Sequence, residues 1–245
     1  MAEQRLHKVL AAAGVDSRRK CEELILSGAV EVNRRVVDKL PAFADPDRDI
    51  ITVNGRRIRQ EQKVYFLLNK PKGVICTNSD PQGRKKAIDM VPVRQRIFCV
   101  GRLDTDTTGI IILTNDNEMA NKLTHPRYGV SKTYVVSVKG EIDGHQIEKL
   151  KKGIRFAEGK TQWASVKVLK RSYKESLIEI TIRQGLNCQV RRMLAGAGLF
   201  VKSLKRTRIG KITDRGLGIG KFRMLSKSEL EGLRKTTKNV IHSDL

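Results

Sequence analysis

The stretch that most constrains the fold runs from Phe98 to Asp116 and reads FCVGRLDTDTTGIIILTND. It begins with an apolar segment, passes through a polar loop and ends in the uninterrupted apolar run 110–113. Short apolar runs beside turn residues are typical of buried strands. Asp104 and Asp106 are therefore predicted to lie in a loop between two core strands, which would hold a carboxylate rigidly enough for chemistry. Capping of turns is the alternative role for both acids.

The formal net charge of +23 limits the partners that this 245-residue chain can have. Such a charge indicates a polyanionic partner, most simply nucleic acid, and solubility alone is the alternative. Aromatic residues make up only 4%, too few for a reader of single strands that depends on stacking. The densest basic region, 182–227, has 12 Lys and Arg but a single acid, Asp214, and we interpret it as a track for an RNA backbone.

The remaining composition argues against several classes of site. Cys21, Cys76, Cys99 and Cys188 form no CxxC pair, so neither a zinc module nor a disulfide framework is predicted. The four histidines show no ligand spacing, and no GxGxxG or P-loop pattern is present. There is no apolar signal segment and no long apolar run. We expect a cytoplasmic monomer that contacts no membrane and uses neither a metal nor a nucleotide cofactor.

Residues 1–60 are predicted to form a small α+β domain. Apolar residues at helical spacing indicate one helix over 6–13 and a second that Asp16 or Ser17 caps. A hairpin over 30–37 and a strand over 50–53 are expected to follow.

Three cations, Arg18, Arg19 and Lys20, open the second predicted helix. They oppose the helix dipole, which favours anions at this end. An external phosphate would remove that electrostatic cost, whereas a tolerated surface cluster is the alternative.

Residues 61–245 are predicted to form a larger α+β domain with a mixed or antiparallel sheet, because strands outnumber helices without regular alternation. Asn187 is expected to cap a helix through Leu194, and the pattern from Ser226 to Glu229 predicts a capping box. The expected strands are 64–68, 74–76, 132–138, 166–169 and 177–182.

Three features could together form a reactive site: the loop carboxylate Asp104, the strand residue Tyr134 and the basic helix start 189–192. A carboxylate can act as a nucleophile or stabilise an oxocarbenium-like sugar. An arginine such as Arg191 would orient it, and a tyrosine can stack on a base or move a proton. The alternatives are a core position for Tyr134 and a phosphate contact for Arg191.

The segment RLHKVLAAAGVDSRRKCEELILSGAVEVNRRVV resembles an S4 RNA-binding domain. The resemblance implies that the two helices and the hairpin dock on structured RNA. It implies RNA contacts from five residues, Arg5, Lys8, Arg18, Arg19 and Lys20.

The segments LLNKPKGVICTNSDPQGR, GRLDTDTTGIIILTND and LTHPRYGVSKTY, with QVRRM, closely resemble the RsuA/RluB-type pseudouridine synthases. The resemblance implies that a ribosomal RNA or pre-ribosomal particle is the partner and that a uridine is converted to pseudouridine. It implies that Asp104 is the catalytic aspartate, with Tyr134 and Arg191 beside it, and that Arg102 and Arg192 contact RNA. At Cys188 the chain departs from a family position that is usually basic or histidine.

A large-subunit RNA target of the RluB type is expected, with a small-subunit target of the RsuA type as the alternative. Two other classes remain open. A non-catalytic assembly factor would share the charge and the S4 module without needing Asp104. A metal-dependent nuclease could use Asp104 and Asp106 as paired ligands.

Overall fold

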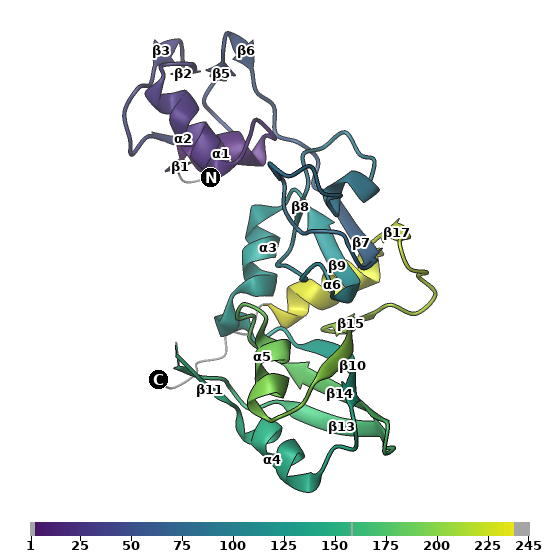
Figure 1. The fold of residues 1–245 in the computed structure, drawn as a ribbon. Helices are drawn as coiled ribbons and strands as arrows, with labels where there is room; N and C mark the ends of the chain where they lie inside the picture. Colours follow the sequence, from purple (N-terminus) through teal and green to yellow (C-terminus); the bar gives the residue numbers. More distant parts are fainter. Residues whose placement is uncertain (1–2, 158, 238–245) are drawn as a thin grey trace. The chain divides into compact units, whose positions relative to one another are not determined.

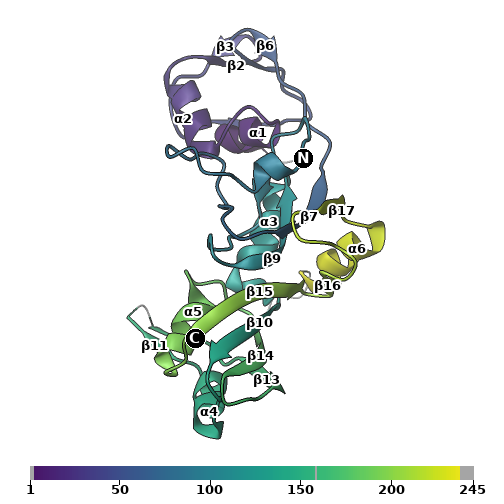
Figure 2. The ribbon, with the colours of Figure 1, turned by 45° about the vertical axis from the view of Figure 1, so that its right-hand side comes forward.

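The computed structural model describes residues 3–157 and 159–237, which divide into two compact units. The first comprises Met1–Val64, Val93–Ile97 and Asn115–Asn117, and the second comprises Tyr65–Pro92, Phe98–Thr114 and Glu118–Leu245. Figures 1 and 2 show the elements of each unit. The predicted division into domains 1–60 and 61–245 stays a prediction.

The first unit combines two helices with short strands. Its described elements are β1 Gln4–Arg5, α1 Leu6–Ala12, α2 Arg18–Leu26, β2 Val30–Val32, β3 Arg35–Val36, β4 Phe43–Ala44, β5 Ile51–Val53 and β6 Arg56–Arg57. The sheet order is β3-β2-β5-β6, and β1 pairs separately with β4. The two helices supply Leu6, Leu10 and Ile25 to a core that Val30 and Ile51 complete from the sheet. This burial of apolar helix stripes is what turns seven- and nine-residue helices into stable ones.

Local sequence signals in this unit act as predicted. Ser17, rather than Asp16, is the N-cap of α2, and its hydroxyl accepts a hydrogen bond from the backbone N–H of Lys20. Asn33 and Arg34 adopt positive φ between β2 and β3, which is the conformation that a tight hairpin turn demands.

The second unit contains one large sheet with helices packed against it. Its described elements are β7 Tyr65–Lys70, β8 Phe98–Cys99, β9 Thr108–Thr114, α3 Asn117–Thr124, β10 Lys132–Lys139, α4 Gly144–Lys152, β11 Arg155–Phe156, β12 Gly159–Lys160, β13 Ser165–Lys170, β14 Glu175–Ile182, α5 Gln189–Gly196, β15 Val201–Ile209, β16 Ile212–Thr213, β17 Phe222–Met224 and α6 Lys227–Thr236. Two 3₁₀ turns lie at Ile88–Met90 and Pro126–Tyr128.

The main path of the sheet runs β13-β14-β10-β15-β9-β7-β17, with β16 and β8 attached beside it. Every ladder between these strands is antiparallel except that between β15 and β9, where Thr108 lies opposite Lys205 and Gly109 lies opposite Arg206. The sheet is therefore mixed, and the predicted α+β class is confirmed.

Helices α3 and α6 cover the half of the sheet that contains β7 and β9 (Figure 1). Met119 and Leu123 of α3 and Leu233 of α6 pack in one buried cluster with Ile110 and Ile112 of β9. The apolar run that the sequence marked is thus the centre of a core, and it holds the preceding loop in place.

Two parts of the predicted secondary structure are wrong. Residues 74–76 do not form a strand, because Ile75 makes only an isolated bridge with Lys86. The long strand β15 was not predicted, since the repeated cations of Val201–Ile209 suggested an exposed track instead. In fact Arg206 is buried, and Lys205 and Arg208 pair with Asp214 and Glu179.

The start of α6 provides a test of what fastens this helix to the sheet. Arg223 of β17 donates two hydrogen bonds of 2.7 Å to the carboxylate of Glu229, which also completes the predicted capping box with Ser226. The Arg223 guanidinium, aided by the Ser226 backbone N–H, lowers the pKa of Glu229 to about 2.

We expect Glu229→Gln to lower the free energy of unfolding by about 1–2 kcal/mol at neutral pH. Because the folded pKa is depressed, this stability is present above the ordinary carboxyl pKa of 4.5 and is lost as the pH falls to about 2. Urea titrations of both proteins should converge across that window, with the exposed Glu231→Gln as the control. A difference that persists at the acid end would contradict this account.

Candidate active site

A cleft of about 120 Å³ in the second unit brings the three predicted reactive residues together. Asp104 enters it from the loop before β9, Tyr134 from β10 and Arg191 from the first turn of α5. The cleft is lined by Val100, Gly101, Arg102, Leu103, Asp104, Thr107, Thr124, Lys132, Tyr134, Ile182, Gly185, Leu186, Cys188, Gln189, Val190, Arg191, Leu204 and Arg206.

Two side chains hold the carboxylate of Asp104, which is 37% exposed. The Nε atom of Arg191 lies 3.8 Å from Oδ2, and the thiol of Cys188 donates a hydrogen bond of 3.3 Å to Oδ1. Burial, followed by this hydrogen bond, raises the pKa of the Cys188 thiol, so the sulfur serves as a donor here. The carboxylate therefore has a fixed orientation while one third of its surface stays open to a ligand.

The start of α5 differs from the prediction. Cys188 rather than Asn187 is the N-cap residue, with φ 48° and no capping hydrogen bond from its side chain. This left-handed backbone is unusual for a residue with a side chain. In this conformation the Cys188 thiol donates its hydrogen bond to Asp104 and does not cap the helix.

Arg191 also supports the loop itself. Its Nη2 atom donates to the carbonyl oxygen of Asp106 at 3.3 Å and reaches the hydroxyl of Thr107 at 3.5 Å. The carboxylate of Asp106 points elsewhere, 3.6 Å from the ammonium of Lys72, and both side chains are largely exposed. Asp106 thus stabilises the loop through its backbone and does not line the cleft.

Tyr134 is buried to 8% exposure but borders the cleft. It lies opposite Ile180 on β14 and opposite Arg206 on β15. Residues paired across neighbouring strands share a face of the sheet. The ring of Tyr134 and the side chain of Arg206 therefore form part of one cleft floor.

Profiles of two families match the chain. That of the RNA pseudouridylate synthases matches residues 64–196, more than half of the chain, and that of the S4 domain matches residues 4–40. The chain is 47% identical over 234 residues to ribosomal large subunit pseudouridine synthase B of Bacillus subtilis, covering 94% of this chain and 96% of that protein. This chain belongs to the RNA pseudouridylate synthase family.

Other relatives agree with that assignment. Ribosomal large subunit pseudouridine synthase B of Pseudomonas aeruginosa is 35% identical over 237 residues, covering 93% of this chain and 61% of the longer relative. A crystal structure of a pseudouridylate synthase is 29% identical, with a TM-score of 0.69 over 94% of this chain and 99% of that one. The predicted family is thus confirmed.

The other predicted RNA-binding residues of the synthase are distributed as follows. Arg102 is exposed and lines the cleft. Arg192 does not line it; its guanidinium stacks over the ring of Phe156, 3.9 Å from the centroid. A stacked arginine of this kind is oriented by the ring.

Five predicted RNA-binding residues of the first unit are all exposed, namely Arg5, Lys8, Arg18, Arg19 and Lys20. Three of them surround the buried His7: burial is the main reason that the pKa of His7 is lowered, and the charges of Arg18, Arg5 and Lys8 lower it further. Glu22 opposes them from 3.4 Å. Lys20 already pairs with Glu23 at 2.8 Å, which raises the pKa of Lys20. The five cations thus lie exposed on β1, α1 and α2, with Glu22 and Glu23 among them.

Sequence reasoning missed three cations of the synthase that support or line the cleft. Lys70, at the end of β7, is fully buried, and Lys132 and Arg206 line the cleft floor. Burial, and secondarily the charge of Arg206, lowers the pKa of Lys132 to about 8. An isolated cation inside a strand pattern gives no sequence signal of burial, because lysine and arginine are usually exposed.

Lys70 secures the loop that carries Asp104. Its ammonium donates to the carbonyl oxygens of Pro71 at 3.0 Å, Val74 at 2.7 Å and, more weakly, Thr105 at 3.5 Å. Burial lowers the pKa of this lysine. The strand predicted over 64–68 is β7, which continues to Lys70. Lys70 is therefore an interior residue of the fold and not the start of an exposed loop.

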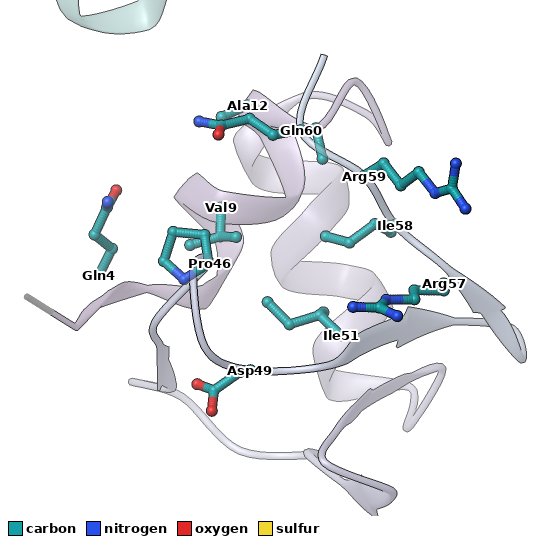
Figure 3. Close-up of a pocket in the computed structure, with 11 residues that line it drawn as sticks. Gln4, Val9, Ala12, Pro46, Asp49, Ile51, Arg57, Ile58, Arg59 and Gln60 are labelled. Carbon is teal, nitrogen blue, oxygen red and sulfur yellow. The ribbon is translucent and has the colours of Figure 1, made fainter. Parts of the chain in front are cut away.

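A larger cavity, of about 410 Å³, lies in the first unit and contains none of the predicted site residues. Figure 3 shows Val9, Ile51 and Ile58 turned toward it, while the guanidinium of Arg59 extends away. The carboxylate of Asp49 is already engaged, by the side-chain amide of Asn33 at 2.8 Å and the backbone N–H of Asp45 at 2.7 Å. The one carboxylate that lines this cavity is therefore already hydrogen-bonded within the first unit.

The described residues contain no group of three or more His, Cys, Asp or Glu side chains positioned to hold a metal ion. None of their helices combines the length and the apolar character that crossing a membrane requires.

We expect Lys70→Met to lower the free energy of unfolding by about 2–3 kcal/mol, because buried carbonyl groups lose their donor. The loop beside Asp104 should also open more often, which is measurable as faster hydrogen exchange at the Thr107 amide, now bonded to the Asp104 carbonyl at 3.0 Å. Lys72→Met, which removes an exposed cation of the same loop region, is the matched control. Equal exchange at Thr107 in both variants would show that Lys70 does not hold the loop.

Proposed function

We propose that the protein isomerises a specific uridine of ribosomal RNA, in the large subunit, to pseudouridine. The observation that carries the proposal is the convergence of Asp104, Tyr134 and Arg191 on one cleft, with Arg191 and Cys188 orienting the carboxylate. The large-subunit target is supported by the 47% identical relative, whose name specifies that subunit.

The reaction conserves every atom of the nucleotide. The bond between C1′ and N1 breaks, the uracil turns, and a bond between C1′ and C5 forms, while C5 loses a proton and N1 gains one. Asp104 is proposed to act on the nucleotide as nucleophile or base. Arg191 holds its carboxylate, and Tyr134 contacts the base from the sheet. These steps call on no metal or organic cofactor.

The target uridine has to leave its stack to reach this cleft. The side chains at the cleft that carry positive charge suit an RNA backbone, and Arg102 is exposed at its margin. Arg192 is proposed as a further RNA contact outside the cleft. The catalytic part is proposed to be residues 61–245.

Residues 1–60 are proposed to bind structured RNA through the helices α1 and α2. The match to the S4 family and the exposure of Arg5, Lys8, Arg18, Arg19 and Lys20 support this role. The partner is proposed to be ribosomal RNA, either free or within a pre-ribosomal particle. The monomeric state and the cytoplasmic location stay predictions.

We expect Asp104→Asn to reduce pseudouridine formation by at least about a thousandfold, because the amide can neither attack nor take up a proton. The measurement is carbodiimide–primer extension across both ribosomal RNAs after incubation with each protein. Asp106→Asn is the matched control: it removes a carboxylate two residues away that does not line the cleft, and it should keep most of the activity.

The same assay separates the alternatives. Modification at a small-subunit position would favour the RsuA-type target. RNA binding without modification would indicate an assembly factor, and cleavage that requires magnesium would indicate a nuclease. Equal modification by wild type and Asp104→Asn would refute the role of Asp104.

We expect neutralisation of Arg18, Arg19 and Lys20 by glutamine to weaken RNA binding and to reduce the slope of log K against log salt by about 2–3. A reduction of about 2 is expected if Lys20 of the wild type keeps its ion pair with Glu23, at 2.8 Å, and contacts no phosphate. Filter binding over a range of salt concentrations measures the slope. Neutralising three lysines of α4, Lys149, Lys151 and Lys152, controls for net charge. A slope reduced equally by both triple variants would count against a specific role of α2.

A further inference from the structure

Arg206, at the centre of β15, is a buried cation whose hydrogen bonds are incomplete. Only 3% of the residue is exposed, yet it lines the cleft. Its Nε atom donates to the carbonyl oxygen of Ile110 at 2.7 Å, whereas its Nη2 atom has no hydrogen-bond partner within residues 3–157 and 159–237. No acidic side chain of the described chain forms an ion pair with it, in contrast to its neighbours Lys205 and Arg208.

Burying such a group lowers the stability of the folded protein. A buried guanidinium that lacks both a counter-ion and a full set of acceptors destabilises a folded protein. An unsatisfied buried donor therefore calls for an explanation, and perturbed charges of this kind concentrate at functional sites. Because Arg206 lines the same cleft as Asp104, its missing partner is expected to arrive with the substrate.

The surroundings of Arg206 restrict what that partner is. Tyr134 lies directly opposite it across β10 and β15. Lys132, two residues before Tyr134 on the same strand, also lines the cleft, and its ammonium donates to the carbonyl oxygen of Val130 at 3.3 Å. Two neighbouring cations thus share the cleft floor, and Asp104 is the one acid among the lining residues.

The apolar part of the same floor favours a flat ring over a hydrated phosphate. Ile182 and Leu204 line the cleft beside the two cations, and both are buried. An apolar wall with a few fixed polar groups is the usual setting for a planar ligand. A phosphate would instead be expected at exposed residues such as Arg102.

The reaction creates a matching anion. When the bond between C1′ and N1 breaks, its electron pair stays with the uracil, and the charge spreads from N1 to the carbonyl oxygens O2 and O4. The pair is used again when C5 bonds to C1′, after which C5 loses its proton and N1 is protonated. Fixed donors aimed at a transient charge are an effective form of catalysis in a site that excludes water.

We propose that Arg206 contacts a carbonyl oxygen of the uracil and stabilises the negative charge that the ring acquires when the glycosidic bond breaks. Lys132 supplies a second positive charge to the same ring. This inference rests on the proposed function. It adds a residue that lies beyond the region 64–196 matched by the catalytic family profile.

The test compares Arg206→Met with wild type in single turnovers on two RNAs, one with uridine and one with 5-fluorouridine at the target. Fluorine stabilises the detached pyrimidine anion without help from the protein. It also replaces the C5 proton, so bond cleavage is followed as disappearance of 5-fluorouridine from nuclease digests by mass spectrometry.

We expect Arg206→Met to slow the reaction of uridine by about 10²–10³-fold, the usual effect of losing one donor to a developing anion. RNA affinity should change by less than about twofold, since the contact matters after binding. On 5-fluorouridine the loss should shrink at least about tenfold.

Arg208→Met is the matched control. It removes an arginine from the same strand whose charge is already paired with Glu179 at 2.9 Å and which does not line the cleft. Its rate should stay within about threefold of wild type on both RNAs. Lys132→Met is the second variant, and it should show the same selective loss on uridine, about tenfold in size.

Three results would overturn the inference. The first is a loss of reaction rate by Arg206→Met that is equal on the uridine RNA and the 5-fluorouridine RNA. If thermal melting shows that Arg206→Met does not fold, the same equal loss by Lys132→Met would count instead. Another is a loss confined to RNA affinity, which would assign Arg206 to a phosphate. The third is an unchanged rate. Wild type that forms no pseudouridine in either ribosomal RNA would refute the proposed function itself, before Arg206 is at issue.

Discussion

The short parallel contact between β9 and β15 is the constraint on which the site depends. Only two residue pairs make it, and at one of them Gly109 lies so close to β15 that a Cβ atom would sit 2.2 Å from the carbonyl oxygen of Arg206. Its φ of 106° also excludes other residues. The contact joins the β7–β9 half of the sheet to the β10–β14 half, and so brings the loop of Asp104 next to Tyr134.

The cleft at this junction has an unusual balance of charge. Asp104 is the one acid among the lining residues, whereas four cations, Arg102, Lys132, Arg191 and Arg206, line it too. The one carboxylate is therefore outnumbered by cations within the cleft. The site thus retains positive charge for an incoming polyanion and for any negative charge that develops on the bound nucleotide.

Much of this fold could be predicted from the sequence, because its local signals act alone. Ser17, the turn at Asn33 and the capping box of Ser226 need only their own neighbours, and the apolar run 110–113 identified the core strand. The convergence of Asp104, Tyr134 and Arg191 was predictable through motif resemblance, although their roles stay predictions. Spacing in the chain gave no way to place Tyr134 against β15, because that pairing joins strands about 70 residues apart.

Strand β15 shows why the remainder escaped prediction. Its cations look alike in the sequence, but the fold assigns them different environments: Lys205 and Arg208 meet acids, whereas Arg206 is enclosed. A register shift between the residues opposite Thr133 and Tyr134 separates the two arginines, so that simple alternation along the strand does not decide which is buried. The cations that give this chain its high net charge therefore lie in different environments. Part of the charge is neutralised by Asp214 and Glu179, part is exposed on the first unit, and Arg206 lines the cleft with no ion-pair partner among the described residues.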